Sequence, residues 1–231
     1  MGLVNLYVCK LPSKRSYQEI QRLLPNISAR VTQKISRYRF LDDAYRTLIG
    51  DLLLHRFFYL NTGYDLRKQR IEITNYGKPN IPTFPSFHYN ISHSGDWVAL
   101  ATHHYPVGVD IEKVQPLESI VVKNLLSHRE YKNMLKHDRP VQAFYEIWTG
   151  KESFVKATGK GLSIPLQSFS VTGMRNIQLI NTTTEDIVKG YLCERYKDLS
   201  RYSLTVCAKQ ADKKSFNDLT ECQFSWLANE L

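Results

Sequence analysis

The stretch Val107-Gly-Val-Asp-Ile-Glu112 alternates apolar residues with glycine and acidic residues. This period of two is typical of a strand with one buried face. Side chains alternate between the two faces of a strand, so we expect Asp110 and Glu112 to project from the same face. Two carboxylates on one face repel each other unless a cation or a proton lies between them. The stretch therefore predicts a strand that carries a candidate cation site.

A second stretch, Trp148-Thr-Gly-Lys-Glu-Ser-Phe-Val-Lys156, has the pattern of a helix. Residues four apart share one side of a helix, which places Trp148, Glu152 and Lys156 in a row. Carboxylates suit a hard cation such as Mg²⁺, which commonly shares its shell with substrate phosphates. Taken singly, a solvated strand face and an ordinary Glu–Lys helix pair explain the two stretches; the combination favours a metal held against a phosphate.

Together the two stretches resemble the two-part signature of the 4'-phosphopantetheinyl transferases, and most closely the surfactin-synthetase-activating type. The resemblance covers roughly the whole chain and is weaker after Thr172. It extends to four further segments: Asp42-Asp-Ala-Tyr-Arg-Thr-Leu-Ile-Gly-Asp51, Tyr76-Gly-Lys-Pro-Asn-Ile-Pro82, Phe87-His-Tyr-Asn-Ile-Ser-His-Ser-Gly-Asp-Trp97 and Gly159-Lys-Gly-Leu-Ser-Ile-Pro165.

The resemblance implies an α+β fold built as a pseudo-dimer, with two similar α+β halves and the active site in the cleft between them. We place the boundary at Tyr105-Pro106. Residues 1–105 would form the half that binds coenzyme A, and residues 106–231 the half that carries the metal and catalytic residues.

The activity that the resemblance implies is the transfer of 4'-phosphopantetheine from coenzyme A to a serine of an apo acyl- or peptidyl-carrier protein, with release of adenosine 3',5'-bisphosphate. It links the chain to nonribosomal peptide and antibiotic biosynthesis. Asp110, Glu112 and Glu152 would hold Mg²⁺, and Lys156 would add positive charge at the phosphate oxygens. The alternative within enzymes is another Mg²⁺-dependent phosphate transfer on the same carboxylates.

Residues in both halves would hold coenzyme A if the resemblance applies residue by residue. Lys34 and Thr47, helped by Arg37, would line the site of the 3'-phosphate. The other predicted contacts are Lys78 at the adenosine end, His93 at the phosphates, Ser92, Lys151 and Lys156. Relatives often carry a basic residue where this chain has Val31, so the 3'-phosphate pocket departs from the family pattern. Ser92 and His93 point to opposite faces of a strand and cannot form a nucleophile–base pair.

Glu130 has two interpretations. Ser127-His-Arg-Glu130 is a capping box that opens a helix, which is a structural role. In relatives the matching acid is an active-site carboxylate and a candidate general base. The serine proton would pass to Glu130 or to Glu152.

The formal net charge of +9 favours anionic partners. Coenzyme A and acidic carrier proteins meet this description. A non-catalytic basic binder of coenzyme A or nucleic acid is the rival interpretation, and the acidic trio disfavours nucleic acid. The four cysteines lack C-x-x-C spacing and are expected to be reduced. With neither a secretory signal nor a membrane-length apolar run apparent, we expect a cytoplasmic monomer.

Periodicity and turn residues predict the remaining elements. Helices are expected over 17–24, 32–40, 42–60 and 141–158, with another opening at Ser127 and a short one at the end of the chain. Residues 113–126 are expected to be mostly loop. Strands are expected over 3–9, 71–74, 89–92, 97–103, 168–172, 177–180, 187–195 and 202–208.

Overall fold

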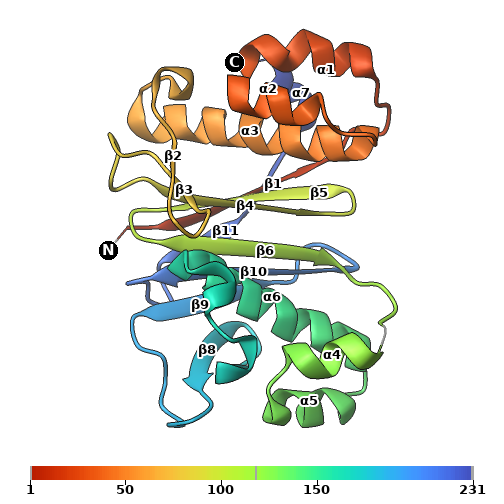
Figure 1. The fold of residues 1–231 in the computed structure, drawn as a ribbon, viewed down its shortest axis with the longest axis vertical. Helices are drawn as coiled ribbons and strands as arrows, with labels where there is room; N and C mark the ends of the chain where they lie inside the picture. The colour runs from red at the N-terminus through yellow and green to blue at the C-terminus, as the bar shows by residue number, and fades with distance from the viewer. Residues whose placement is uncertain (1, 118, 230–231) are drawn as a thin grey trace.

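Two sheets lie against each other in the middle of the molecule, and each carries helices on its outer side (Figure 1). The structure is a computed structural model that describes residues 2–117 and 119–229. The first sheet has the order β11-β1-β5-β4 and the second the order β6-β10-β9-β8-β7. The strands of the first sheet are β1 (Val4–Lys10), β4 (His88–Ser94), β5 (Trp97–His103) and β11 (Phe216–Cys222). Those of the second are β6 (Val107–Lys113), β7 (Phe169–Thr172), β8 (Asn176–Asn181), β9 (Tyr191–Tyr196) and β10 (Tyr202–Lys209).

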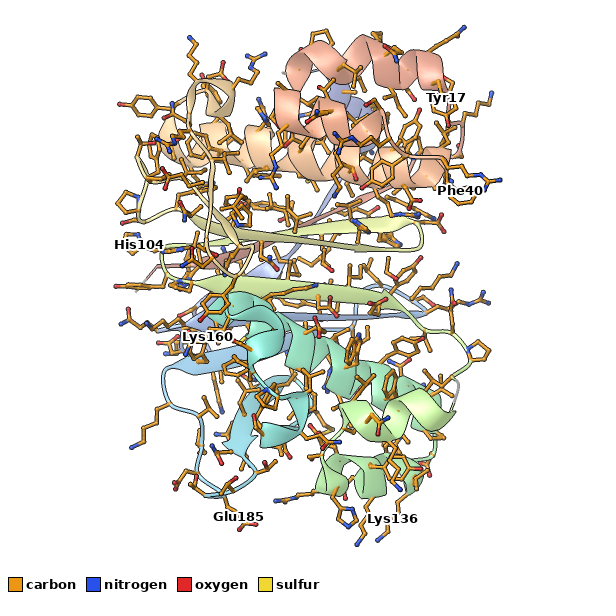
Figure 2. The ribbon with its side chains drawn as sticks, viewed as in Figure 1. Tyr17, Phe40, His104, Lys136, Lys160 and Glu185 are labelled. Atoms are coloured by element: carbon orange, nitrogen blue, oxygen red, sulfur yellow. The ribbon has the colours of Figure 1, made fainter. Side chains whose placement is uncertain are left out.

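Helices form the two outer layers. The first sheet is covered by α1 (Tyr17–Leu23), α2 (Ala29–Ile35), α3 (Leu41–Thr62) and α7 (Phe224–Asn229). The second is covered by α4 (Ser119–Leu125), α5 (His128–Leu135) and α6 (Pro140–Thr158). A small ribbon of β2 (Glu72–Ile73) and β3 (Pro79–Asn80) follows α3. Side chains fill the space between the layers, with Tyr17 and Phe40 at the helical end of the first half and Lys136 and Glu185 at the opposite end (Figure 2).

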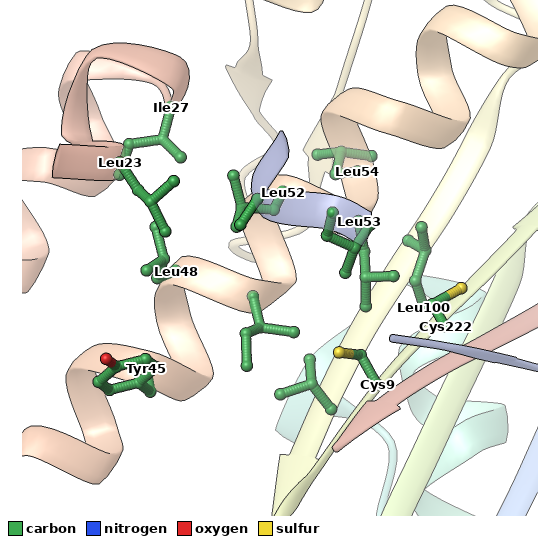
Figure 3. Close-up of a cluster of buried hydrophobic side chains, with 14 of the residues drawn as sticks. Cys9, Leu23, Ile27, Tyr45, Leu48, Leu52, Leu53, Leu54, Leu100 and Cys222 are labelled. Atoms are coloured by element: carbon green, nitrogen blue, oxygen red, sulfur yellow. The ribbon is translucent and has the colours of Figure 1, made fainter. Parts of the chain in front are cut away.

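The alternation of side chains along each strand divides the buried residues into separate cores. Along β1, Leu6 and Val8 face the second sheet, whereas Cys9 faces the helices. The helical core packs α3 against the first sheet through residues such as Leu52, Leu53 and Leu100 (Figure 3). Burial of this much apolar surface is the main term that holds the layers together.

The two halves repeat one plan. In each, a first strand pairs antiparallel with a later strand, β1 with β5 and β6 with β10. A long helix between the two strands, α3 or α6, packs on the outer face of the sheet. The predicted α+β architecture of two similar halves is confirmed.

The end of the chain departs from the predicted division. Residues 106–231 were expected to form the second half, but β11 pairs in parallel with β1, and α7 packs on α3 (Figure 1). The partner edge of β1 would otherwise expose unpaired backbone groups, and Leu227 gains a fully buried position on the helical core. The boundary near Tyr105-Pro106 stays a prediction for the rest of the chain.

Several element bounds also differ from those expected. The second helix begins at Ala29 rather than 32 and ends at Ile35, and a helix, α4, occupies part of the expected loop at 113–126. β9 begins at Tyr191, four residues later than expected, and β11 was missed. The expected capping box is present: Ser127 accepts a hydrogen bond from the Glu130 N–H, and the Glu130 side chain accepts one from Ser127. All four cysteines are free and buried, as expected.

Within residues 2–117 and 119–229, no helix combines the length and the apolar character that spanning a membrane requires.

Candidate active site

The acidic residues of β6 face α6. Val107, Val109 and Ile111 are fully buried between the sheets, so the alternate residues point the other way. Gly108 lets the helix approach this face closely, because a Cβ there would lie 2.1 Å from the backbone oxygen of Ser153. Any side chain at Gly108 would therefore push α6 away. The close contact brings the acids of β6 next to Glu152 and Lys156 of α6.

Asp110 lies at the centre of this group and is almost entirely buried. Its Oδ1 accepts hydrogen bonds from the Lys156 ammonium at 2.5 Å and from the Ser92 hydroxyl at 3.1 Å. Its Oδ2 is buried without a hydrogen-bond partner among the described residues. Burial raises the pKa of Asp110, and Lys156 opposes that rise. An acceptor oxygen left bare at this depth is costly unless something else binds it.

Glu112 and Glu152 complete the acidic trio, which is defined here as Asp110, Glu112 and Glu152. Glu112 accepts a 2.8 Å hydrogen bond from the Ser94 hydroxyl. Burial raises the pKa of Glu112 and of Glu152, and the charge of Asp110 raises both further. The three carboxylates therefore interact unfavourably when all are ionised, which is the electrostatic condition that a divalent cation relieves.

The trio fits a hard cation by its all-oxygen donor set, the bare Oδ2 of Asp110 and this mutual repulsion. In the described residues, however, no three acidic, histidine or cysteine side chains are already gathered in a metal-binding arrangement. The Lys156 ammonium forms an ion pair with Asp110 and supplies the positive charge at this carboxylate.

A basic cavity of about 470 Å³ opens between α2, α3 and β4. Lys34, Thr47 and His93 line it, and Thr47 is held by a 3.0 Å hydrogen bond to the Tyr38 hydroxyl. Burial lowers the pKa of His93, and the nearby charges of Arg46, Lys34 and Lys156 lower it further. The charge of Lys156 therefore acts on a residue that lines the cavity.

Some expected residues do not line this cavity. In the part of the chain that the structure describes, its lining includes Arg30, Val31 and Arg46 but not Arg37. Arg46 donates to the Gly95 carbonyl oxygen at 2.7 Å and pairs with Asp43, so it also holds the turn between β4 and β5. Arg46 was not singled out from the sequence.

Lys78 uses its ammonium inside the protein. It donates to the backbone oxygens of Val107, Lys156 and Ala157 at 2.9, 2.7 and 3.1 Å. Burial lowers the pKa of Lys78 to about 8. The side chain thus ties the turn after β2 to the C-terminal end of α6, where cations are favoured. Contact with a ligand through the ammonium would require these three bonds to break.

Glu130 and Lys151 form a buried ion pair away from the acidic trio. The pair is 2.9 Å apart, with side chains 3% and 0% exposed. Glu130 also accepts the Ser127 and Val171 N–H groups at 2.7 Å each. The Lys151 ammonium donates to the oxygens of Leu166 and Phe169. This placement links α5, α6 and β7 and does not fit a contact between Lys151 and coenzyme A.

Asn90 and Ser94 were not predicted from the sequence to belong to the site. Both lie on β4 with Ser92 between them, and their side chains bond the backbone of β6. The signal was present as Asn90-x-Ser92-x-Ser94, a polar period of two beside an apolar strand pattern.

Clustered carboxylates with a lysine ammonium among them suit an enzyme that acts on a phosphate ester. Comparison with known proteins makes the class specific. The model of the 4'-phosphopantetheinyl transferase superfamily matches residues 106–207, and the model of the 4'-phosphopantetheinyl transferase N-terminal region matches residues 11–105.

Three curated bacterial relatives are similar over most of their length. The 4'-phosphopantetheinyl transferase Sfp of Bacillus subtilis (strain 168) is 36% identical over 215 residues, covering 90% of this chain and 94% of the relative. The transferase ffp of Bacillus subtilis is 38% identical over 217 residues, with the same coverage. The transferase psf-1 of Bacillus pumilus is 32% identical over 229 residues, or 96% of each chain. This chain therefore belongs to the 4'-phosphopantetheinyl transferase superfamily, as the sequence resemblance indicated.

Proposed function

We propose that this enzyme moves 4'-phosphopantetheine from coenzyme A to a serine hydroxyl of an apo acyl- or peptidyl-carrier protein and releases adenosine 3',5'-bisphosphate. One observation carries the proposal. The Lys156 ammonium bonds Asp110 of the acidic trio, and its charge lowers the pKa of His93, which lines a basic cavity of about 470 Å³. The names of the relatives support the reaction.

Asp110, Glu112 and Glu152 would hold Mg²⁺ at this position. When bound, the metal supplies charge neutralisation at the phosphate oxygens. Lys156 lies on α6 one turn after Glu152, and its side chain is 29% exposed. Its ammonium can therefore donate to a phosphate oxygen that approaches the acidic trio. A phosphate ligand in this position would displace water. Charge-assisted hydrogen bonds are stronger where water is excluded.

The basic cavity would bind the phosphates of coenzyme A. Lys34 and Arg30 on α2 and His93 on β4 present donors to the same space, with Thr47 of α3 beside them. Arg30 supplies positive charge one residue before Val31, where the family pattern often has a basic residue. We assign Lys78 a structural role at the end of α6 in place of a side-chain contact with the ligand.

Glu152 is the better candidate to accept the serine proton. The carboxylate of Glu130 is buried, and each of its oxygens already accepts a hydrogen bond. Glu152 is only partly buried, lies in the trio and has a raised pKa. A carboxylate with a raised pKa is a stronger base towards a hydroxyl proton. The proton would therefore come to rest on an oxygen of Glu152.

The partner class follows from charge. A chain with a formal net charge of +9 attracts acidic carrier proteins and polyanionic coenzyme A. The four free, buried cysteines fit a reducing compartment, and cytoplasm remains our expectation, as does a monomer. The rival interpretation, a non-catalytic binder, is not favoured, because the similar proteins are transferases.

Intact-protein mass spectrometry of an apo carrier protein tests the proposal. The carrier is incubated with this enzyme, coenzyme A and Mg²⁺, and a serine-to-alanine carrier serves as the control. We expect the carrier, and not the control, to gain the mass of one phosphopantetheine group. An unchanged carrier mass with several acyl- and peptidyl-carrier proteins would contradict the proposal.

A further inference from the structure

The two sheets meet along a seam that has no backbone ladder. β4 and β6 are edge strands of their sheets, and they lie side by side. Three side chains of β4 accept hydrogen bonds from N–H groups of β6. Asn90 Oδ1 accepts from Val109 at 2.9 Å, Ser92 Oγ from Ile111 at 3.4 Å and Ser94 Oγ from Lys113 at 3.1 Å.

The seam satisfies an edge that would otherwise be open. An outer strand presents unpaired N–H groups, and leaving such groups buried without acceptors is costly. Both strands contribute every second residue, so the acceptors of β4 and the donors of β6 stay in register over three successive bonds. The seam therefore fixes the register of β6, and of its acidic residues, relative to β4.

Two of the three acceptors also hold a carboxylate. Ser92 donates its hydroxyl proton to Asp110 Oδ1 at 3.1 Å, and Ser94 donates to Glu112 Oε2 at 2.8 Å. A serine hydroxyl has one proton and two lone pairs. One lone pair of Ser94 accepts the Lys113 N–H, and its single proton is donated to Glu112. Asn90 makes the seam bond and is not recorded in contact with the trio.

We infer that Ser94 is a positioning residue that orients Glu112 for a cation held by the acidic trio. The inference rests on the proposed function, because it assumes that the trio binds a metal. Hydrogen bonds to ligating carboxylates fix their orientation, and their loss typically weakens metal binding by about 10–100-fold. Ser94 itself touches neither the predicted ligand cavity nor Lys156 among the contacts of the described residues.

The chain offers matched variants. Ser94→Ala removes one seam bond and the bond to Glu112, whereas Asn90→Ala removes one seam bond alone. Ser94→Thr keeps a hydroxyl, and its branched side chain suits a strand. Both alanine variants should lower the unfolding temperature, since each removes one bond to an N–H group of β6, and Ser94→Ala should lower it further because the bond to Glu112 is also lost. Only Ser94→Ala should affect a metal.

Electron paramagnetic resonance of Mn²⁺, which suits the same oxygen ligands as Mg²⁺, measures metal binding to the enzyme without coenzyme A. We expect Ser94→Ala to raise the dissociation constant of Mn²⁺ by about 10–100-fold, Ser94→Thr to restore it, and Asn90→Ala to leave it unchanged. The KM for coenzyme A should stay constant at saturating Mg²⁺. Wild-type affinity in Ser94→Ala, or an equal loss in Asn90→Ala, would overturn the inference alone. Wild-type enzyme that binds no Mn²⁺, or binds it equally after Asp110→Ala, would overturn the metal site as well.

Discussion

Glu152 and Glu130 are both carboxylates of the second half, but their surroundings differ completely. Glu130 is 3% exposed, and the Lys151 ammonium and two backbone N–H groups occupy its oxygens. Glu152 is partly buried; this burial raises its pKa, and the charges of Asp110 and Glu112 raise it further. One carboxylate is satisfied by the fold, and the other is held among like charges. The contrast shows that the surroundings of a carboxylate, rather than its residue type, indicate a functional role.

The same contrast separates the two lysines of α6. Lys151 and Lys156 are five residues apart, and the first is enclosed with Glu130 while the second reaches Asp110 with part of its side chain exposed. Burial lowers the pKa of Lys151. A buried ion pair contributes little net stability, but the loss of one partner is strongly destabilising. We therefore expect substitutions in the Glu130–Lys151 pair to lower stability, and substitutions in the acidic trio to lower turnover.

The largest effect should follow removal of Asp110. Asp110→Ala takes away the central carboxylate of the trio and the partner of Lys156. Because the metal is expected to lower the barrier by several kcal/mol, the turnover number should fall by about 10³-fold or more. The unfolding temperature should change little, since repulsion within the trio is relieved. Turnover is followed by the mass of the carrier, and a variant with near-normal turnover would remove Asp110 from the site.

Glu130→Gln should act on stability instead of turnover. Glutamine can still complete the capping box, but Lys151 would be left buried without its counter-charge. We expect a loss of about 3–5 kcal/mol in the free energy of unfolding, measured by urea denaturation. Turnover per folded molecule should stay within about tenfold of wild type, well short of the loss expected for a general base.

A matched pair sharpens the test of Glu130. Glu130→Gln combined with Lys151→Met removes both charges, and should recover much of the lost stability because no unpaired ion remains. A Glu130→Gln enzyme that is fully stable but inactive would show that Glu130 acts in catalysis.

Much of this site could be predicted from the sequence. The period of two in β6 and the spacing of Glu152 and Lys156 place the acids and the ammonium together, as the structure has them. The roles of Lys78 and Lys151 could not be predicted from the sequence, because their ammonium groups bond backbone oxygens of segments distant in the chain. The strand β11 was missed for a similar reason, since its pairing with β1 joins the two ends of the chain.

The basic cavity gives a more moderate effect. Lys34→Ala should weaken coenzyme A by about 10–100-fold, corresponding to a charge-assisted contact of about 1.5–3 kcal/mol. Binding of 3'-dephospho-coenzyme A should change far less. Isothermal titration calorimetry measures both. Arg37→Ala is the control, because Arg37 does not line the cavity among the described residues. Equal losses for both ligands would show that Lys34 does not contact the 3'-phosphate.

The smallest effect concerns pH and stability without metal. The pKa of Glu152 is raised in the folded state, so its contribution to stability is complete below its unfolded pKa of about 4.3 and is lost as pH rises through the folded value. Glu152→Gln removes the ionisable group, and with it the loss of stability as pH rises. At neutral pH in chelator, the variant should be more stable than wild type. Scanning calorimetry between acidic and neutral pH checks this, and a constant difference across the range would contradict it.

The most direct measurement is transfer to one apo carrier by wild-type enzyme, Glu152→Gln and Glu130→Gln as Mg²⁺ is titrated back from excess chelator. We expect no transfer by any of them before Mg²⁺ is added. Wild type and folded Glu130→Gln should then respond at similar Mg²⁺ concentrations, whereas Glu152→Gln should stay inactive or need far more Mg²⁺. Full wild-type transfer in excess chelator, or a Glu152→Gln response equal to that of wild type, would contradict these expectations.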